Sequence, residues 1–124
     1  MKKFLLNPWI IGIAVIVFGS IGYAAYSSST PGEYDDFAKC LGDKGAIFYG
    51  AFWCPHCKEQ KQIFGKSAKY LPYIECALPS GQGTTEVCNQ AGVKSYPTWE
   101  FADGTKQTGK LSILELSRKT NCSI

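Results

Sequence analysis

The chain has 124 residues, enough for one domain but not for two, and its composition is that of an ordinary globular protein apart from six cysteines. Its net charge is +3, and two of the positive charges are Lys2 and Lys3. The remainder is close to neutral, which argues against a nucleic-acid-binding surface.

The first element in chain order is an uncharged stretch from Phe4 to Tyr26. Its densest part, residues 9–26, would span about 27 Å as a helix, close to the hydrocarbon thickness of a bilayer. Trp9 at one end and Tyr23 and Tyr26 at the other are aromatic residues of the kind found at membrane interfaces. This pattern predicts a transmembrane anchor over residues 9–26.

The charges around this stretch predict its orientation. Lys2 and Lys3 precede it and no basic residue follows before Lys39, so the positive-inside rule places residues 1–8 in the cytoplasm and the rest of the chain outside. A cleaved signal peptide is an alternative, because residues 25–27 resemble a cleavage site, but the apolar run is longer than usual for one. A buried soluble helix is disfavoured because the run has no polar face. Anchor and signal peptide would both export the remainder, and export allows disulfides.

A change of composition follows the apolar stretch. Residues 27–33 read SSSTPGE, and small polar residues with proline and glycine predict a flexible linker. Residues 34–124 then remain for a single domain. A domain of this size benefits from covalent cross-links.

The pattern of apolar residues in this domain predicts strands that alternate with helices. The predicted elements are a helix at 34–45, a strand at 46–52, a helix at 54–70, a strand at 72–76, a helix at 84–92, a hairpin at 98–109 and a helix at 112–120. The hairpin turns at Asp103 and Gly104, and Ser112 with Glu115 predicts a capping box. The order predicts an α/β fold with a central sheet covered on both sides, in which residues 46–76 form a parallel crossover unit.

Two cysteines, Cys54 and Cys57, are separated by two residues in the stretch AFWCPHCKEQ, where a predicted strand gives way to a helix. The free N–H groups and the dipole at a helix N-terminus stabilise the thiolate of Cys54, which makes it the attacking group. Cys57 lies one turn further along and can close a disulfide with it. Pro55 suits a first helical turn, and His56 can stabilise the thiolate further, which makes the disulfide a stronger oxidant.

Two other interpretations of this pair are weaker. A zinc site would need a second pair of ligands, yet the chain has no second Cys-x-x-Cys, and its sole histidine, His56, lies inside the motif. An inert structural bridge is disfavoured because a disulfide across two intervening residues is expected to be strained and exposed. A redox centre without metal or cofactor is therefore predicted.

The motif FYGAFWCPHCKEQ, with SYPTWE some forty residues later, resembles the thioredoxin fold. The resemblance rests on Trp53 before the first cysteine, Lys58 after the second, and Pro97 before a strand. It implies a cis Tyr96–Pro97 bond against the active disulfide, with Pro97 shaping the edge where peptides dock. Trp53, Pro55 and Tyr96 are then expected to contact the substrate.

The Pro-His dipeptide resembles the oxidising, DsbA-type members of this fold. Most of residues 37–118 is similar to the thioredoxin-like domain fused to bacterial vitamin K epoxide reductase homologues, although here a single anchor is expected instead of their four-helix quinone-reducing domain. Two departures stand out. Phe48 replaces the buried acid of cytoplasmic thioredoxins, so proton transfer from Cys57 needs water or another group, and a helix stands where full thioredoxins have an N-terminal strand.

Four further cysteines allow three pairings once Cys54 and Cys57 are set aside. We favour Cys76–Cys88, because a strand end and the next helix carry them, and Cys40–Cys122, which would join the first helix of the domain to the segment after the last. Both are interpreted as structural bridges. A relay in which Cys76 and Cys88 pass electrons remains an alternative.

These inferences predict a membrane-anchored, extracytoplasmic thiol–disulfide oxidoreductase. Cys54 would be the nucleophile, Cys57 the resolving thiol and His56 the group that tunes the potential. The resemblance implies oxidation of exported protein thiols and recycling by a quinone-linked membrane partner, either vitamin K epoxide reductase-like or DsbB-like. The alternatives are an extracytoplasmic reductase or isomerase, and a non-catalytic binding module that is cross-linked by disulfides.

Overall fold

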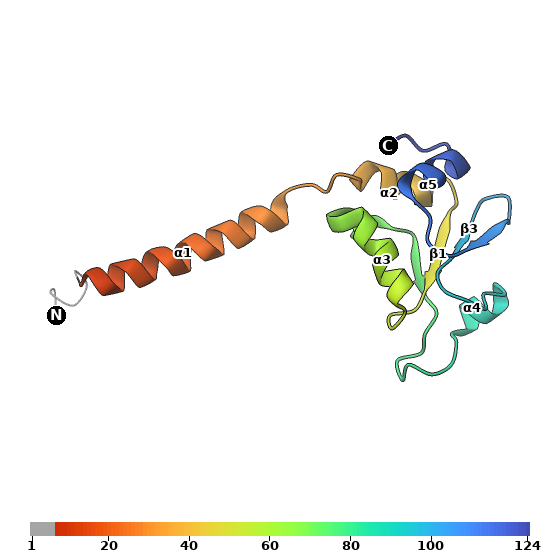
Figure 1. Ribbon diagram of the computed structural model, residues 1–124, viewed down its shortest axis with the longest axis horizontal. Helices are drawn as coiled ribbons and strands as arrows, with labels where there is room; N and C mark the ends of the chain where they lie inside the picture. Colours follow the sequence, from red (N-terminus) through yellow and green to blue (C-terminus); the bar gives the residue numbers. More distant parts are fainter. Residues whose placement is uncertain (1–6) are drawn as a thin grey trace. The chain divides into compact units, whose positions relative to one another are not determined.

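The computed structural model describes residues 7–124, and the chain divides into two compact units, Met1–Pro31 and Gly32–Ile124 (Figure 1). Lys2 and Lys3, on which the predicted orientation depends, lie outside the described residues. The predicted orientation of residues 1–8 therefore stays a prediction.

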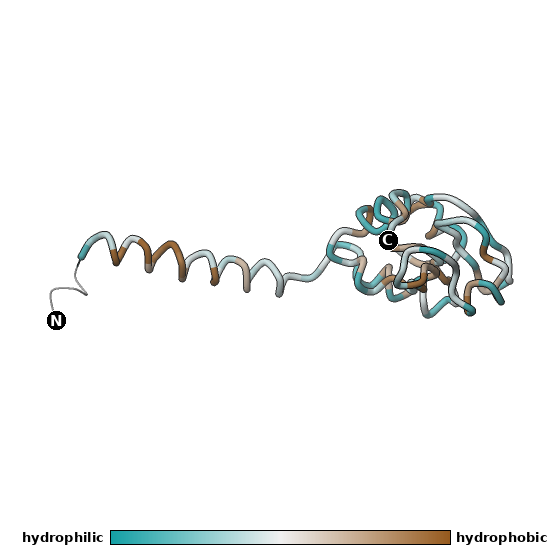
Figure 2. The backbone as a smooth tube through the Cα atoms, turned by 90° about the horizontal axis from the view of Figure 1, so that it is seen from below, coloured by the Kyte–Doolittle hydropathy of each residue, from teal (hydrophilic) through white to brown (hydrophobic). Residues whose placement is uncertain are grey.

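The first unit contains helix α1, Pro8–Ser29, whose first free N–H groups are capped by the Asn7 side chain, which accepts a hydrogen bond from Trp9 N at 3.1 Å. The helix is long and apolar enough to cross a membrane, and Figure 2 shows the apolar residues along it. It extends through residues 27–29, so the predicted linker is wrong there. The hydroxyls of Ser28 and Ser29 donate to carbonyls one turn back, which lets these polar residues continue the helix.

The second unit is built on a four-stranded sheet in the order β2-β1-β3-β4. Its strands are β1 (Ile47–Gly50), β2 (Tyr73–Glu75), β3 (Thr98–Glu100) and β4 (Lys106–Thr108). Strand β1 pairs in parallel with β2 and antiparallel with β3, and β3 and β4 form the predicted hairpin. The sheet is therefore mixed, and the predicted crossover unit is confirmed.

The helices of this unit are α2 (Asp35–Asp43), α3 (Pro55–Phe64), α4 (Glu86–Gln90) and α5 (Ile113–Thr120). The capping box at the start of α5 is confirmed. The predicted helix at 54–70 is interrupted, because Gly65 takes a φ of 52° and the segment Gly65–Tyr70 continues as a 3-10 helix.

Successive residues of β1 face opposite sides of the sheet and show how the helices cover it. Phe48 belongs to a core cluster with buried side chains from α2, α3 and α5, whereas Tyr49 packs with Cys88 of α4 and with Val93. Phe48 also stacks on Trp99 with ring centroids 4.9 Å apart. Helices therefore cover both faces, and the predicted α/β architecture is confirmed.

A fully buried side chain, Gln60, fixes α3 against the rest of the domain. Its Oε1 accepts hydrogen bonds from Leu111 N at 2.7 Å and from Trp99 Nε1 at 3.2 Å, and its Nε2 donates to Leu111 O at 2.9 Å. These bonds satisfy a polar group that would otherwise be expensive to bury. This role of Gln60 was not predicted from the sequence.

Both predicted structural bridges are present. Cys40–Cys122 joins α2 to the segment after α5, with Cα atoms 5.9 Å apart, and Cys76–Cys88 joins the end of β2 to α4, with Cα atoms 5.6 Å apart. Cys76, Cys88 and Cys122 are almost completely buried. Their burial favours structural bridges over an electron relay.

Candidate active site

Cys54 is the N-cap residue of α3, with extended backbone angles, and Pro55 occupies the first turn. The strand-to-helix connection is tight, because Cys54 N donates to Ala51 O at 3.0 Å and Lys58 N donates to Cys54 O at 3.2 Å. The predicted place of the motif, at the positive end of a helix, is therefore confirmed.

The two cysteines are less exposed than expected for a surface bridge. Cys54 is 5% exposed and Cys57 is 1% exposed, and both are free thiols. The Tyr96–Pro97 peptide bond is cis, as the resemblance implied. Cys54 Sγ lies 3.6 Å from the Tyr96 carbonyl oxygen, so the loop that carries the cis proline lies against the Cys54 sulfur.

The environment of Cys57 favours its neutral thiol. Burial raises the pKa of Cys57 to about 12, and the neighbouring Cys54 adds to this, against the opposing effects of the Ala51 backbone and the Lys61 charge. Cys57 must therefore lose a proton whenever its sulfur becomes a nucleophile.

Two exposed aromatic side chains border the motif. Phe52 is 49% and Trp53 is 50% exposed. The Trp53 ring meets Tyr96 edge to face at 5.9 Å, and the Tyr96 hydroxyl lies 3.3 Å from that of Thr84. The structure thus brings Trp53 and Tyr96 together beside Cys54, while their contact with a substrate stays a prediction.

The side chain of His56 lies on the outer face of α3. It is 65% exposed, and its Nδ1 lies 3.5 Å from Oε2 of Glu59, an oxygen that also pairs with Lys110. Lys110, with a smaller contribution from His56, lowers the pKa of Glu59. The predicted influence of His56 on the redox potential stays a prediction.

A carboxylate that was not predicted from the sequence, that of Glu75, organises the connection before Cys54. Oε1 of Glu75 accepts hydrogen bonds from Phe52 N at 3.1 Å and Ala77 N at 2.9 Å, and its Oε2 accepts one from Tyr73 Oη at 2.7 Å. The only signal in the sequence was an acidic residue in an otherwise apolar strand. Phe48, which the resemblance places where cytoplasmic thioredoxins carry a buried acid, is fully buried and packs edge to face on Tyr73 at 5.1 Å.

No family model matches the chain. The chain is 42% identical over 103 residues, 79% of its length, to thiol-disulfide oxidoreductase LTO1 of Arabidopsis thaliana, and 26% identical over 81 residues, 62% of its length, to protein disulfide-isomerase erp38 of Neurospora crassa.

The domain is thioredoxin-like. Its mixed sheet is flanked by helices, and its Cys-x-x-Cys stands where a strand gives way to a helix. The chain covers 27% and 22% of the lengths of these two curated relatives. These two longer relatives are named as a thiol–disulfide oxidoreductase and a protein disulfide-isomerase.

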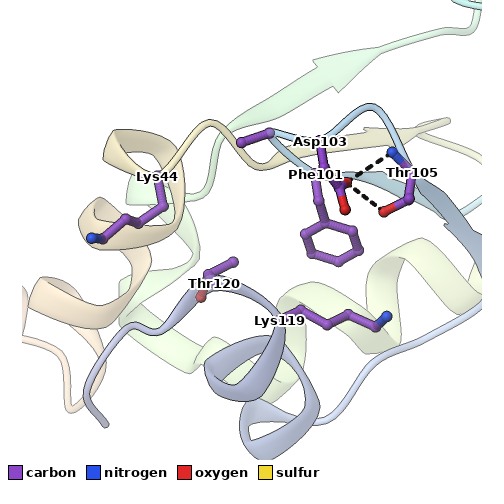
Figure 3. A pocket seen from close by; sticks show the side chains of 7 residues that line it. Lys44, Phe101, Asp103, Thr105, Lys119 and Thr120 are labelled. Atoms are coloured by element: carbon purple, nitrogen blue, oxygen red, sulfur yellow. Dashed lines mark hydrogen bonds between the residues drawn. The ribbon is translucent and has the colours of Figure 1, made fainter.

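A hollow of about 490 Å³ lies elsewhere on the thioredoxin-like domain (Figure 3). It is lined by Lys44, Phe101, Ala102, Asp103, Thr105, Lys119 and Thr120. The Asp103 carboxylate accepts hydrogen bonds from the backbone and hydroxyl of Thr105, at 3.0 and 2.7 Å, which lower its pKa. The cysteine motif does not line this hollow, so the hollow is separate from the candidate active site.

The raised pKa of Cys57 predicts that the reduced protein loses stability in alkali. An unfolded cysteine ionises near pH 8.5, whereas folded Cys57 keeps its proton up to about pH 12. Its contribution is fully present below about pH 8.5, and each pH unit above this lowers the free energy of unfolding by at most about 1.4 kcal/mol. Urea unfolding of the reduced chain in detergent at pH 7 to 10 measures the slope. Cys57→Ser, the control, should flatten it, and equal slopes would contradict the prediction.

Proposed function

We propose that the chain is a membrane-anchored, extracytoplasmic oxidoreductase that oxidises the thiols of exported proteins through its Cys54–Cys57 pair. The observation that carries the proposal is the position of Cys54, at the N-cap of α3 and 3.6 Å from the Tyr96 carbonyl of the cis-proline loop. Cys54 is 5% exposed at the start of the helix, and Cys57 is 1% exposed and lies one turn further along.

The reaction is an exchange of bonds between sulfurs. A substrate thiolate attacks Cys54 Sγ of the oxidised pair, the Cys54–Cys57 bond breaks, and Cys57 takes up the electron pair and a proton. A second substrate thiolate then attacks the substrate sulfur of the mixed disulfide, and Cys54 leaves as a thiolate, stabilised by the helix N-terminus. The substrate is oxidised by two electrons and the pair is reduced.

The oxidising direction rests on the motif. The Pro-His dipeptide resembles DsbA-type sites, and stabilisation of the leaving Cys54 thiolate favours the reduced form of the pair. Return to the disulfide then requires an electron acceptor. A quinone-linked membrane protein, similar to vitamin K epoxide reductase homologues or to DsbB, is the partner that we propose.

The extracytoplasmic location is supported by the covalent structure. Cys40–Cys122 and Cys76–Cys88 are bridges of the kind that persist in oxidising compartments. Helix α1 supplies a segment long enough to hold the thioredoxin-like domain at a membrane. Lys2 and Lys3 would keep the N-terminal end of the chain in the cytoplasm.

The reduction potential of the pair tests this proposal. The full chain in detergent is equilibrated with glutathione buffers, and the fraction of Cys54–Cys57 disulfide is measured by thiol trapping and mass spectrometry. We expect a value between those of protein disulfide isomerase and DsbA, about −180 to −120 mV. A value near that of thioredoxin, about −270 mV, would favour a reductase. A pair that does not exchange with glutathione would favour a non-catalytic binding module.

A further inference from the structure

The exchange cycle requires a route for the Cys57 proton. Because Cys57 is 1% exposed, bulk water has little access to its thiol. Phe48 of β1, which belongs to the same core cluster, is apolar and carries no proton acceptor. Another group must accept the proton when Cys57 becomes a nucleophile and return it when Cys57 is the leaving group.

Gly50 leaves room for such a group. A β carbon at Gly50 would lie 3.1 Å from Cys57 Sγ, 3.2 Å from Tyr73 Oη and 2.7 Å from Tyr73 Cε2. The sulfur and the hydroxyl oxygen therefore lie around the same point, close enough for direct contact or for one bridging water. Any side chain larger than that of glycine would separate them.

The Tyr73 hydroxyl already points to an acceptor. It donates to Oε2 of Glu75 at 2.7 Å, while backbone groups of Phe52 and Ala77 hold Oε1 of the same carboxylate. Glu75 is only half-buried, so the carboxylate links the buried thiol to the surface. Burial and the adjacent Glu75 raise the pKa of Tyr73. Tyr73 therefore remains a protonated hydroxyl, which can relay a proton but does not persist as a phenolate.

The other charged group at this cluster is Lys61 of α3. Its Nζ lies 3.5 Å from the centroid of the Tyr73 ring, and its charge lowers the pKa of Cys57. The titratable groups that meet here are therefore Cys54 and Cys57 at the start of α3, Lys61 in its last turn, and Tyr73 and Glu75 from β2. Lys61 stabilises the developing Cys57 thiolate without accepting its proton.

We propose that the Tyr73 hydroxyl and the Glu75 carboxylate form the proton route of Cys57, a role that rests on the proposed thiol–disulfide exchange. When Cys57 attacks Cys54 in a mixed disulfide, the Cys57 proton passes to Tyr73 Oη as the Tyr73 proton passes to Glu75 Oε2. The Cys54–Cys57 bond forms, the bond from Cys54 to the substrate sulfur breaks, and the electron pair leaves with that sulfur. When the pair oxidises a substrate, the same groups return the proton to Cys57.

Two variants separate this role from a structural one. Tyr73→Phe removes the hydroxyl but keeps the ring beneath Lys61 and against Phe48. Glu75→Gln keeps an oxygen for Phe52 N and Ala77 N but replaces the proton-accepting oxygen with an amide. Tyr70→Phe is the matched control, because Tyr70 also lies beneath lysines, Lys39 and Lys69, at the end of the 3-10 helix.

The experiment uses the reduced full chain in detergent and oxidised glutathione. Acid-quenched samples are analysed by mass for the Cys54–glutathione adduct and for the Cys54–Cys57 disulfide, from pH 6 to 10. We expect adduct formation to stay within about twofold of wild type, and its resolution at pH 7 to slow by about tenfold or more in both variants. This gap should close towards pH 10, where hydroxide takes the proton, and Tyr70→Phe should behave as wild type.

The outcomes are distinguishable. Wild-type resolution rates and pH profiles in Tyr73→Phe and Glu75→Gln would overturn the proton route and leave the proposed function intact. A wild-type protein that forms no glutathione adduct would overturn both. If Glu75→Gln proves unstable by thermal unfolding, Tyr73→Phe alone decides, since that variant loses a single oxygen atom.

Discussion

Replacing Cys54 by serine is expected to abolish thiol–disulfide exchange, and replacing Cys57 by serine is expected to halt it at the mixed disulfide. Cys54 stands at the N-cap of α3 beside the cis-proline loop and is 5% exposed, whereas Cys57 lies one turn further along and is 1% exposed. A serine hydroxyl at residue 54 can neither form nor accept a disulfide, so we expect the rate to fall by at least about a thousandfold. The Cys57→Ser variant retains the attacking sulfur but lacks the resolving one.

The measurement is reduction and oxidation of a dithiol peptide, combined with mass mapping of the adducts. Cys57→Ser should accumulate a peptide bound to Cys54, and Cys54→Ser should accumulate none. Intact Cys40–Cys122 and Cys76–Cys88 bridges in both variants are the control for correct folding. An adduct on Cys57 of the Cys54→Ser protein, with none on Cys54 of the other, would reverse the assigned roles.

Much of the fold could be predicted because its signals are local. The turn at Asp103 and Gly104 is closed by Gly104 N donating to Phe101 O at 2.8 Å, and Gly104 takes a φ of 81°, which glycine adopts readily. Ser112 and Glu115 cap α5 within one turn. The helical continuation at residues 27–29 could not be predicted from composition, since serine favours linkers unless its hydroxyl bonds back to the helix.

The site was predictable only in part, because some of its contacts join residues that are distant in the sequence. Cys54 and Cys57 lie at a strand-to-helix junction, and neighbouring residues alone determine that geometry. Glu75 bonds Phe52 across 23 positions, and Gln60 bonds Leu111 across 51. Such contacts depend on which strands pair and which faces the helices cover, so a single acidic or amide residue in the sequence does not reveal them.

The two structural bridges differ in the length of chain that they close. Cys40 and Cys122 are 82 positions apart, and Cys76 and Cys88 are 12 apart. In the chain-entropy model a bridge stabilises by restricting the unfolded chain, by about 3 kcal/mol for the shorter loop and about 4.5 kcal/mol for the longer one. The longer bridge also fastens α2, which contributes Phe37 and Leu41 to the main core cluster.

Removing Cys40–Cys122 with the double variant Cys40→Ala/Cys122→Ala is therefore expected to lower the free energy of unfolding by about 4.5 kcal/mol. The matched control is Cys76→Ala/Cys88→Ala, for which the expected loss is about 1.5 kcal/mol smaller. Urea unfolding of each variant in detergent, with Cys54–Cys57 kept reduced, measures both losses. An equal or larger loss for the shorter bridge would mean that packing of Cys76 and Cys88 against Tyr49 and Val93, and not restriction of the unfolded chain, dominates its contribution.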